Sequence, residues 1–237
     1  MRQSDVNELL GYTGDLSIEF EKIKDKAQTD VGIQEIYRPK VKACIEQLRS
    51  CLDYIALDIY EFLKRIHPEK IKVVKHVYFP YNKDEVTFKA MAEKNLPGLF
   101  LNQSDIYNIL EARQSYKCGD AWLLNICELS NELKHDKLLI QEKVATKEVD
   151  LFNGAIKVRA QNAVISGNFY NGIVQSKDII ISRGSVISNY TGKEKDFVIK
   201  DWTGFIFKEK RIDIIVLISK ANIEITKLSN EVYEKIK

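Results

Sequence analysis

The strongest pattern in the chain is a regular recurrence of apolar residues between positions 41 and 66. Alternating spacings of four and three residues separate Val41, Ile45, Leu48, Leu52, Ile55, Ile59, Phe62 and Ile66. Only a helix places such residues on one face. Pro39 suits its first turn and Pro68 follows its end. We therefore expect a helix of about 26 residues, roughly 40 Å long.

The C-terminal stretch repeats this pattern. The same spacings separate the apolar residues Ile214, Ile218, Ala221, Ile225, Leu228, Val232 and Ile236. Burial of each large aliphatic side chain contributes roughly 1.5 to 3 kcal/mol, so both apolar seams need to be covered. We expect the two long helices to pack against each other or against a partner chain.

Shorter helices are predicted between the two long ones. They cover residues 16–27, 85–94, 104–114 and 120–141. Ser104 and Asp120 are the expected N-caps of the last two, because their side-chain oxygens can accept from free backbone N–H groups. Residues 73–79 are predicted as a short strand or an extended connector.

From residue 144 to residue 211 the pattern changes to a period of two, interrupted by turn dipeptides. These dipeptides are Asn153-Gly154, Asn171-Gly172, Arg183-Gly184, Thr191-Gly192 and Thr203-Gly204. They predict a small antiparallel β unit. Because the C-terminal helix restores the pattern of the first, the β unit is interpreted as an insertion.

The predicted fold class is α+β, mainly α-helical: a bundle with long antiparallel helices and a β insertion before the C-terminal helix. Its domains are residues 1–143, the first part of the bundle; 144–211, the insertion; and 212–237, the helix that completes the bundle.

Composition limits the classes of function. Hydrophobic residues make up 45% and charged residues 30%, as in ordinary globular proteins. Lys and Arg number 36 against 34 Asp and Glu, which excludes a protein that coats nucleic acid by charge alone. Within residues 144–211 the count is 11 basic against 7 acidic, so any nucleic-acid contact is expected to be local.

Location and cofactors are predicted from what the chain lacks. The longest aliphatic run, residues 214–218, is far shorter than the roughly 20 residues of a membrane span, and the start has no apolar signal core. We expect a cytoplasmic protein. No C-x-x-C occurs and the three histidines are scattered, so neither a cofactor nor a metal is predicted. The four cysteines are expected to be buried free thiols; Cys44 and Cys51 lie about 10 Å apart on one helix, too far to pair.

One polar stripe is a candidate for chemistry. Glu128, Asn131 and His135 follow at spacings of three and four and share a face of the helix predicted over 120–141. A histidine beside a carboxylate and an amide can act as a general acid or base. The alternative is the solvated face of a surface helix. Arg49 and Asp53 lie one turn apart on the first long helix; they either form a surface pair or face Asn131 and His135.

Five segments, in this order, resemble a widespread group of bacterial cytosolic proteins. They are R-S-C-L-D-Y-I-A (49–56), Y-F-P-Y (78–81), L-P-G (96–98), L-E-A-R-Q (110–114) and L-S-N-E-L-K-H (129–135). This group in turn is similar to the HEPN superfamily, α-helical domains found in toxin, abortive-infection and antiviral systems. Many HEPN proteins are metal-independent ribonucleases with a motif of Arg, a polar residue often Asn, three more residues and His.

The resemblance implies roles for individual residues. Asn131 and His135 match the motif, whereas Ser130 occupies the arginine position. His135 would assist attack of a ribose 2′-hydroxyl on its own phosphate, with Asp53 orienting it. Loss of the arginine would cost on the order of 10² to 10³ in rate. Arg49 or Arg113 could supply this cation only from another helix.

Further RNA contacts are expected from Lys134 and Arg113. The β insertion adds the aromatic residues Phe169, Tyr170, Tyr190 and Trp202, which either stack on bases or pack in the core.

Two hypotheses follow. The first is a HEPN-like protein that binds or cleaves RNA in a phage-defence or toxin-type system, with Arg49, Asp53, Asn131 and His135 at its site. The second is a non-catalytic helical scaffold or sensor that docks a protein partner, with Asp53, Asn131, Lys134 and His135 as a polar lock between helices. A homodimer is expected under either. Small-molecule binding between the bundle and the insertion is a third possibility.

Overall fold

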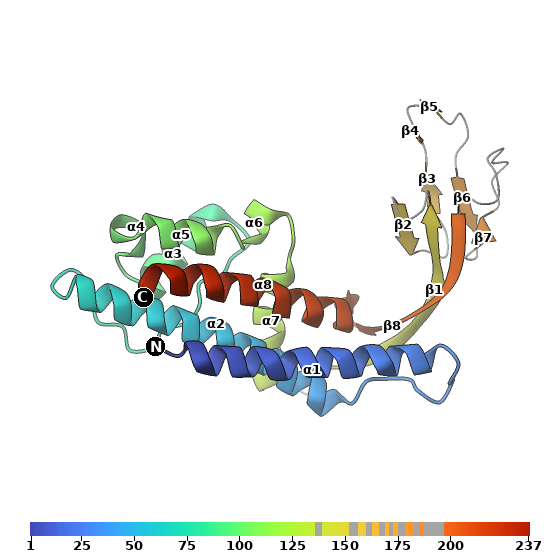
Figure 1. Cartoon of the computed structure of the whole chain (residues 1–237), viewed down its shortest axis with the longest axis horizontal. Coiled ribbons are helices and arrows are strands. Elements are labelled where there is room, and N and C mark those ends of the chain that lie inside the picture. The colour runs from blue at the N-terminus through green and yellow to red at the C-terminus, as the bar shows by residue number, and fades with distance from the viewer. Residues whose placement is uncertain are drawn as a thin grey trace. The chain divides into compact units, whose positions relative to one another are not determined.

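The two apolar seams lie on two long helices that pack against each other in the computed structural model (Figure 1). These are α2 (Arg38–Ile66), with a proline in its first turn, and α8 (Ile214–Ile236). The carboxylate of Asp213 caps α8 by accepting the backbone N–H groups of Ile215 and Val216, both at 3.0 Å. The two seams therefore cover each other within one chain, the first of the two arrangements expected from the sequence.

The structure describes part of the chain. Backbone is described for residues 1–135, 139–151, 156–159, 163–165, 169–170, 173–174, 179–182, 185–186 and 197–237, and side chains for 1–134, 139–145 and 202–237. By its internal contacts the chain divides into two units. The first, called the helical unit, comprises residues 1–22, 36–141 and 207–237; the second comprises 23–35 and 142–206.

Helix α1 (Gln3–Ala27) begins well before the predicted start at residue 16. Gly11 and Gly14 weaken the local helix signal in this stretch. Tertiary contacts offset that weakness: Asn222 of α8 donates to the carbonyl of Leu10 at 2.8 Å and to Thr13 Oγ1 at 2.7 Å.

Five shorter helices follow α2: α3 (Glu85–Asn95), α4 (Leu99–Asn102), α5 (Ser104–Glu111), α6 (Ser115–Cys118) and α7 (Trp122–His135). Ser104 is the first residue of α5 rather than its cap, which is Gln103. The helix predicted to reach residue 141 ends at His135. The carbonyl of Ile140 accepts the Lys208 N–H at 3.0 Å, so this part of the chain already pairs like a strand.

The predicted β segment is present. One sheet has the order β2-β1-β8-β9, from β1 (Gln141–Leu151), β2 (Ile156–Arg159), β8 (Phe197–Phe207) and β9 (Ile212–Asp213). A second joins β3 (Ala163–Ile165), β6 (Ile179–Ser182) and β7 (Ser185–Val186); β4 (Phe169–Tyr170) pairs with β5 (Ile173–Val174). Strands β1 and β2 are antiparallel, with Val149 opposite Val158. The predicted α+β class, mainly helical, is confirmed.

The predicted turn at Thr203-Gly204 is wrong, because both residues lie inside β8. A Cβ at Gly204 would lie 2.1 Å from the ring of Trp202, so the glycine makes room for that ring. The other four predicted turns, the side chains of Phe169 and Tyr170, and Tyr190 lie outside the described residues. In the described part of the chain, no helix is long and apolar enough to cross a membrane.

Both ends of the chain are tied to the middle of α2 through the fully buried carboxylate of Asp58. It accepts the backbone N–H of Arg2 at 2.6 Å and the Arg2 guanidinium at 2.7 Å. Tyr233 near the end of α8 donates its hydroxyl to the same carboxylate at 2.7 Å. In Figure 1 the two termini accordingly lie at the same end of the helical unit.

The cysteines predict a simple labelling result. All four are free; Cys44, Cys51 and Cys127 are buried, whereas Cys118 is exposed, which corrects the expectation for that residue. Burial raises the pKa of Cys44 and Cys51 to about 12 and that of Cys127 to about 11, so these thiols stay protonated and unreactive at neutral pH. Iodoacetamide should add one label to the native protein and four after denaturation, as read by intact mass. Two or more rapid labels in the native state would contradict this burial.

Candidate functional site

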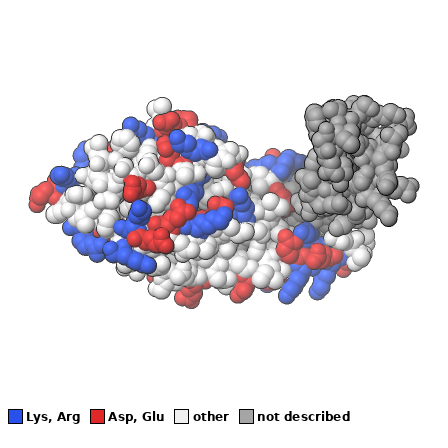
Figure 2. Space-filling model, turned by 45° about the horizontal axis from the view of Figure 1, so that its top comes forward, with Lys and Arg blue, Asp and Glu red and all other residues white. Residues whose placement is uncertain are grey.

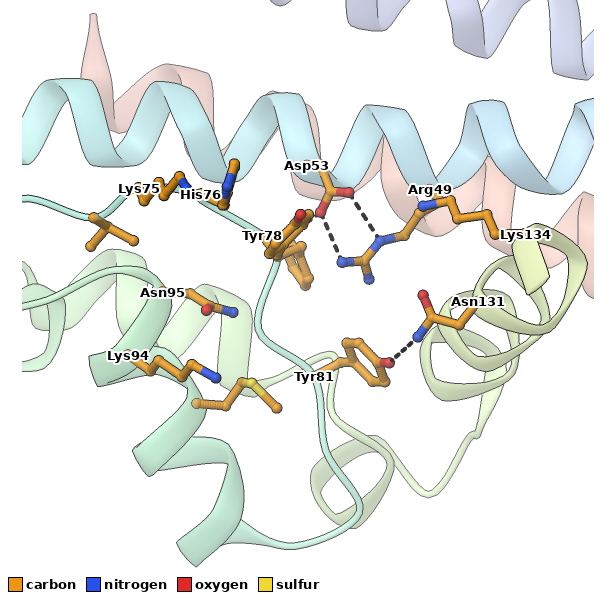
Figure 3. Close-up of a pocket in the computed structure, with 13 residues that line it drawn as sticks. Arg49, Asp53, Lys75, His76, Tyr78, Tyr81, Lys94, Asn95, Asn131 and Lys134 are labelled. Carbon is orange, nitrogen blue, oxygen red and sulfur yellow. Dashed lines mark hydrogen bonds and ion pairs between the residues drawn. The ribbon is translucent and has the colours of Figure 1, made fainter.

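A pocket of about 610 Å³ opens in the helical unit between α2, α3, α7 and the connector formed by residues 67–84 (Figure 3). Its volume falls within the range of small-molecule and cofactor sites. Thirteen residues line it: Arg49, Asp53, Val74, Lys75, His76, Tyr78, Phe79, Tyr81, Met91, Lys94, Asn95, Asn131 and Lys134.

The connector forms one wall of the pocket without being a helix or a strand. Side chains hold its backbone instead. The Tyr60 hydroxyl donates to the carbonyl of Lys72 at 3.2 Å and accepts the N–H of Val74 at 3.1 Å. Asp53 accepts the N–H of Phe79 at 2.9 Å, so α2 anchors the connector at two separate points.

Gln114 holds the last part of this wall. It is buried, and its side-chain amide donates to the carbonyl of Pro80 at 3.4 Å and accepts the N–H of Asn82 at 3.0 Å. Tyr81 lies between these two anchored residues, so its ring is presented to the pocket by a fixed backbone.

Arg49 is the buried cation of the site, only 6% exposed. Its guanidinium binds both carboxylate oxygens of Asp53, with Nε 3.1 Å from one and Nη2 2.9 Å from the other. Its Nη1 donates to the sulfur of Cys127 at 2.7 Å. Burial lowers the pKa of Arg49, but Cys127 and Asp53 raise it more, so the group stays charged. Three of its five N–H bonds are thereby used, which leaves two for a ligand.

The Arg49 guanidinium lies close to two further polar residues of the pocket, Tyr81 and Asn131. The guanidinium carbon stands 5.3 Å from the centre of the Tyr81 ring, and Figure 3 shows the guanidinium directed toward Tyr81 and Asn131. Asn131 donates its amide to the Tyr81 hydroxyl at 3.0 Å. Burial raises the pKa of Tyr81, so it is a neutral phenol; because it accepts from Asn131, its own hydrogen is available to the pocket.

The pocket carries an excess of positive charge. Arg49, Lys75, Lys94 and Lys134 line it against the single carboxylate of Asp53, a formal excess of three. Within the described residues, no carboxylate pairs with any of the three lysines. On the face of the molecule drawn in Figure 2, by contrast, basic and acidic side chains stand next to one another. The attraction for an anion is therefore local.

This set of groups can bind a phosphate. Two guanidinium N–H bonds, a phenol hydrogen and the Lys134 ammonium are all donors, and those from Arg and Lys are charge-assisted. Among the described residues, no group of three or more His, Cys, Asp or Glu side chains is placed to hold a metal ion.

The structure brings together four of the residues predicted from sequence. Arg49, Asp53, Asn131 and Lys134 all line the pocket, and Arg49 and Asp53 form the predicted pair. This pair is mostly buried, so the alternative of a surface ion pair is wrong. Asn131 and Lys134 are exposed, on the open side of the pocket.

The remaining predicted residues have different outcomes. His135 is the last residue of α7, and its side chain lies outside the described residues, so its expected contact with Asp53 stays a prediction. Arg113 does not line the pocket; it donates to the carbonyl of Ile109 and pairs with Glu231 of α8. Of the two arginines considered as the missing cation, the structure places Arg49 beside Asn131.

Ser130, which occupies the arginine position of the resembled motif, lies inside the bundle. Its side chain is fully buried, and its hydroxyl has no hydrogen-bond partner in the described part of the chain. An arginine there would have to enter the helix interface. Arg49 instead reaches Cys127, one turn before Ser130 on α7, from the side of α2.

Sequence reasoning missed several pocket residues. Tyr81 was visible only as part of Y-F-P-Y, and Cys127, Lys94 and Asn95 carried no signal. The sequence signal that could have pointed to the connector is the presence of several aromatic residues in a long stretch with neither a helical nor a strand period. Gln114, the last residue of L-E-A-R-Q, now has a role in holding it.

Comparison of the chain with protein-family models, with curated proteins and with solved structures gave no match.

Proposed function

We propose that the protein binds RNA in this pocket and cleaves it, as a HEPN-like protein of a toxin-type or phage-defence system. One observation carries the proposal. Arg49, a buried and charged arginine from α2, has two free N–H bonds and lines the same pocket as Asn131, so it could supply the cation that the resembled motif has where this chain has Ser130. The resemblance supplies the class of ligand, and the excess positive charge of the pocket agrees with it.

Each group has a role in the proposed reaction. Arg49, Tyr81 and Lys134 would bind the phosphate oxygens and stabilise the charge that develops on them. His135, four residues after Asn131, would move the proton between the 2′-hydroxyl and the leaving oxygen. The 2′-oxygen attacks phosphorus while the bond to the 5′-oxygen breaks, which gives a 2′,3′-cyclic phosphate and a 5′-hydroxyl. Asp53 acts on Arg49, by fixing the orientation of its guanidinium.

A cleavage assay tests the proposal directly. Purified protein incubated with total RNA and EDTA should yield products with cyclic phosphate ends, and His135→Ala should abolish them. Lys40→Ala is a matched control, because Lys40 pairs with Glu19 away from the pocket. Equal products from wild type and His135→Ala would exclude a catalytic role for this histidine.

RNA binding should also depend on salt to a defined extent. Neutralisation of three to four phosphates by the cations of the pocket predicts a slope of log affinity against log salt of about −2 to −3 for a single strand. Affinity should therefore fall about 15- to 60-fold between about 50 and 200 mM salt. Fluorescence anisotropy with a labelled oligoribonucleotide measures this slope. A slope near zero would show that phosphates are not the groups recognised.

The second candidate function is a non-catalytic scaffold or sensor that docks a protein partner. The buried set of Arg49, Asp53 and Cys127 favours it, because such a set fixes the packing of α2 on α7 whether or not RNA binds. His135→Ala separates the two functions. Under the lock hypothesis it lowers the melting temperature by several degrees, whereas under the catalytic one it removes cleavage with little loss of stability.

A further inference from the structure

Asn95 is a mostly buried polar residue whose side chain does not pair with any other described residue of the helical unit. It is the last residue of α3, is only 6% exposed and lines the pocket. Within the described residues its side-chain amide has no hydrogen-bond partner. Figure 3 shows it directed from α3 toward the middle of the pocket. The oxygen and nitrogen of the amide are not among the fully buried unpaired atoms of the described residues, so they stay open to the pocket, where a ligand can pair with them.

The position of Asn95 is fixed by the turn that follows it. The N–H of Leu96 donates to the carbonyl of Ala92 at 2.8 Å, and the N–H of Gly98 donates to Glu93 at 3.1 Å. Gly98 has a φ of 77°, and a Cβ there would lie 2.9 Å from Ile71. This turn ends α3 directly after Asn95, so the amide is held on a rigid helix end.

Two exposed aromatic rings flank the same part of the pocket. His76 and Tyr78 are stacked, with ring centroids 6.4 Å apart and planes inclined by 30°. Tyr78 is 50% exposed, although its ring is large and apolar. Exposed, preordered rings next to cations are the usual platform on which single-stranded nucleic acids stack their bases.

A second cavity of about 550 Å³ shares Val74, Lys75 and Lys94 with the pocket and adds Lys72 and Glu93. Its lining carries three lysines against one carboxylate, so it also has an excess of positive charge. A ligand with several phosphates in a row can occupy both cavities at once, whereas a mononucleotide can occupy only one.

We infer that Asn95, His76 and Tyr78 form a nucleobase subsite that prefers adenine. This inference rests on the proposed RNA binding and names the base that the pocket selects. The Asn95 amide offers one donor and one acceptor side by side. Adenine matches them with a ring nitrogen that accepts and the N6 amino group that donates, the two-bond pairing through which asparagine reads adenine in the DNA major groove.

Anisotropy with fluorescein-labelled oligoribonucleotides tests the inference on the full chain. Wild type should bind oligo(A) at least tenfold more tightly than oligo(U) or oligo(C), and Asn95→Ala should bind all three alike. Tyr78→Ala should weaken binding of all three about tenfold, because stacking does not depend on sequence. Asn108→Ala is the matched control: it lies on α5, is exposed and does not line the pocket.

A measurement on wild type alone covers the case in which Asn95→Ala fails to fold. An oligomer with purine in place of adenine lacks the N6 amino group and should lose the tenfold preference. Wild type that binds RNA with equal affinity for all bases, or Asn95→Ala that keeps the preference for adenine, overturns the inference and leaves the proposed function standing. Wild type that binds none of the oligomers overturns both.

Discussion

Arg49→Gln is expected, under the proposed function, to lower the single-turnover rate of RNA cleavage about 10²- to 10³-fold, because it would remove the cation proposed to stabilise charge on the phosphoryl oxygens. Glutamine keeps much of the length of arginine, so the packing between α2 and α7 is disturbed little. Asp53 retains the N–H of Phe79 and is 22% exposed, which limits the cost of leaving it without its partner. The melting temperature of the variant should be recorded with its rate.

Arg113→Gln decides between the two arginines that could supply the missing cation. Arg113 is paired with Glu231 outside the pocket, so its loss should leave the rate within a factor of two or so of wild type. Arg49→Lys keeps the positive charge but loses the bidentate ion pair with Asp53, so an intermediate rate is expected. A normal rate in Arg49→Gln together with a slow Arg113→Gln would reverse the assignment.

Asp58→Ala is expected to lower the free energy of unfolding by about 3 kcal/mol, because it strips three hydrogen bonds from buried or half-buried donors. The Tyr233 hydroxyl would lose its partner, and the Arg2 guanidinium would keep its exposed ion pair with Glu61. For a chain of this size the melting temperature should fall by roughly 6 to 12 °C. Thermal and urea unfolding followed by circular dichroism measure both quantities.

Glu61→Gln is the matched control for this prediction. Glu61 binds the same Arg2 guanidinium as Asp58 but is 51% exposed, so its ion pair is solvated and contributes little. We expect a change of at most about 0.5 kcal/mol. Equal losses for Asp58→Ala and Glu61→Gln would show that the buried network does not anchor the chain ends.

Periodicity was enough to predict the long helices, because burial of a full apolar stripe overrides other preferences. Helix α2 follows the spacing of its seam to Ile66, and α8 begins directly after its cap, Asp213. The Arg49–Asp53 pair was also predictable, since an ion pair at a spacing of four needs only the helix. That the pair is buried was not predictable, because burial depends on where α7 packs.

Signals that depend on distant residues were missed. The connector has no period, and Tyr60, Asp53 and Gln114, far from it in sequence, define its course. Thr203-Gly204 has the composition of a turn, yet both residues lie in a strand. Gly204 is needed there because a side chain would collide with the Trp202 ring.

The sequence by itself determined the helices that frame the pocket, the Arg49–Asp53 pair and the placing of Asn131 and His135 one turn apart on α7, because each follows from spacing along one helix. Only the tertiary structure decided that α2 supplies the cation beside Asn131, that Cys127 and Tyr81 contact it, and that Asn95 faces the same pocket. Those contacts join residues from separate elements, and no local pattern encodes the packing that brings them together.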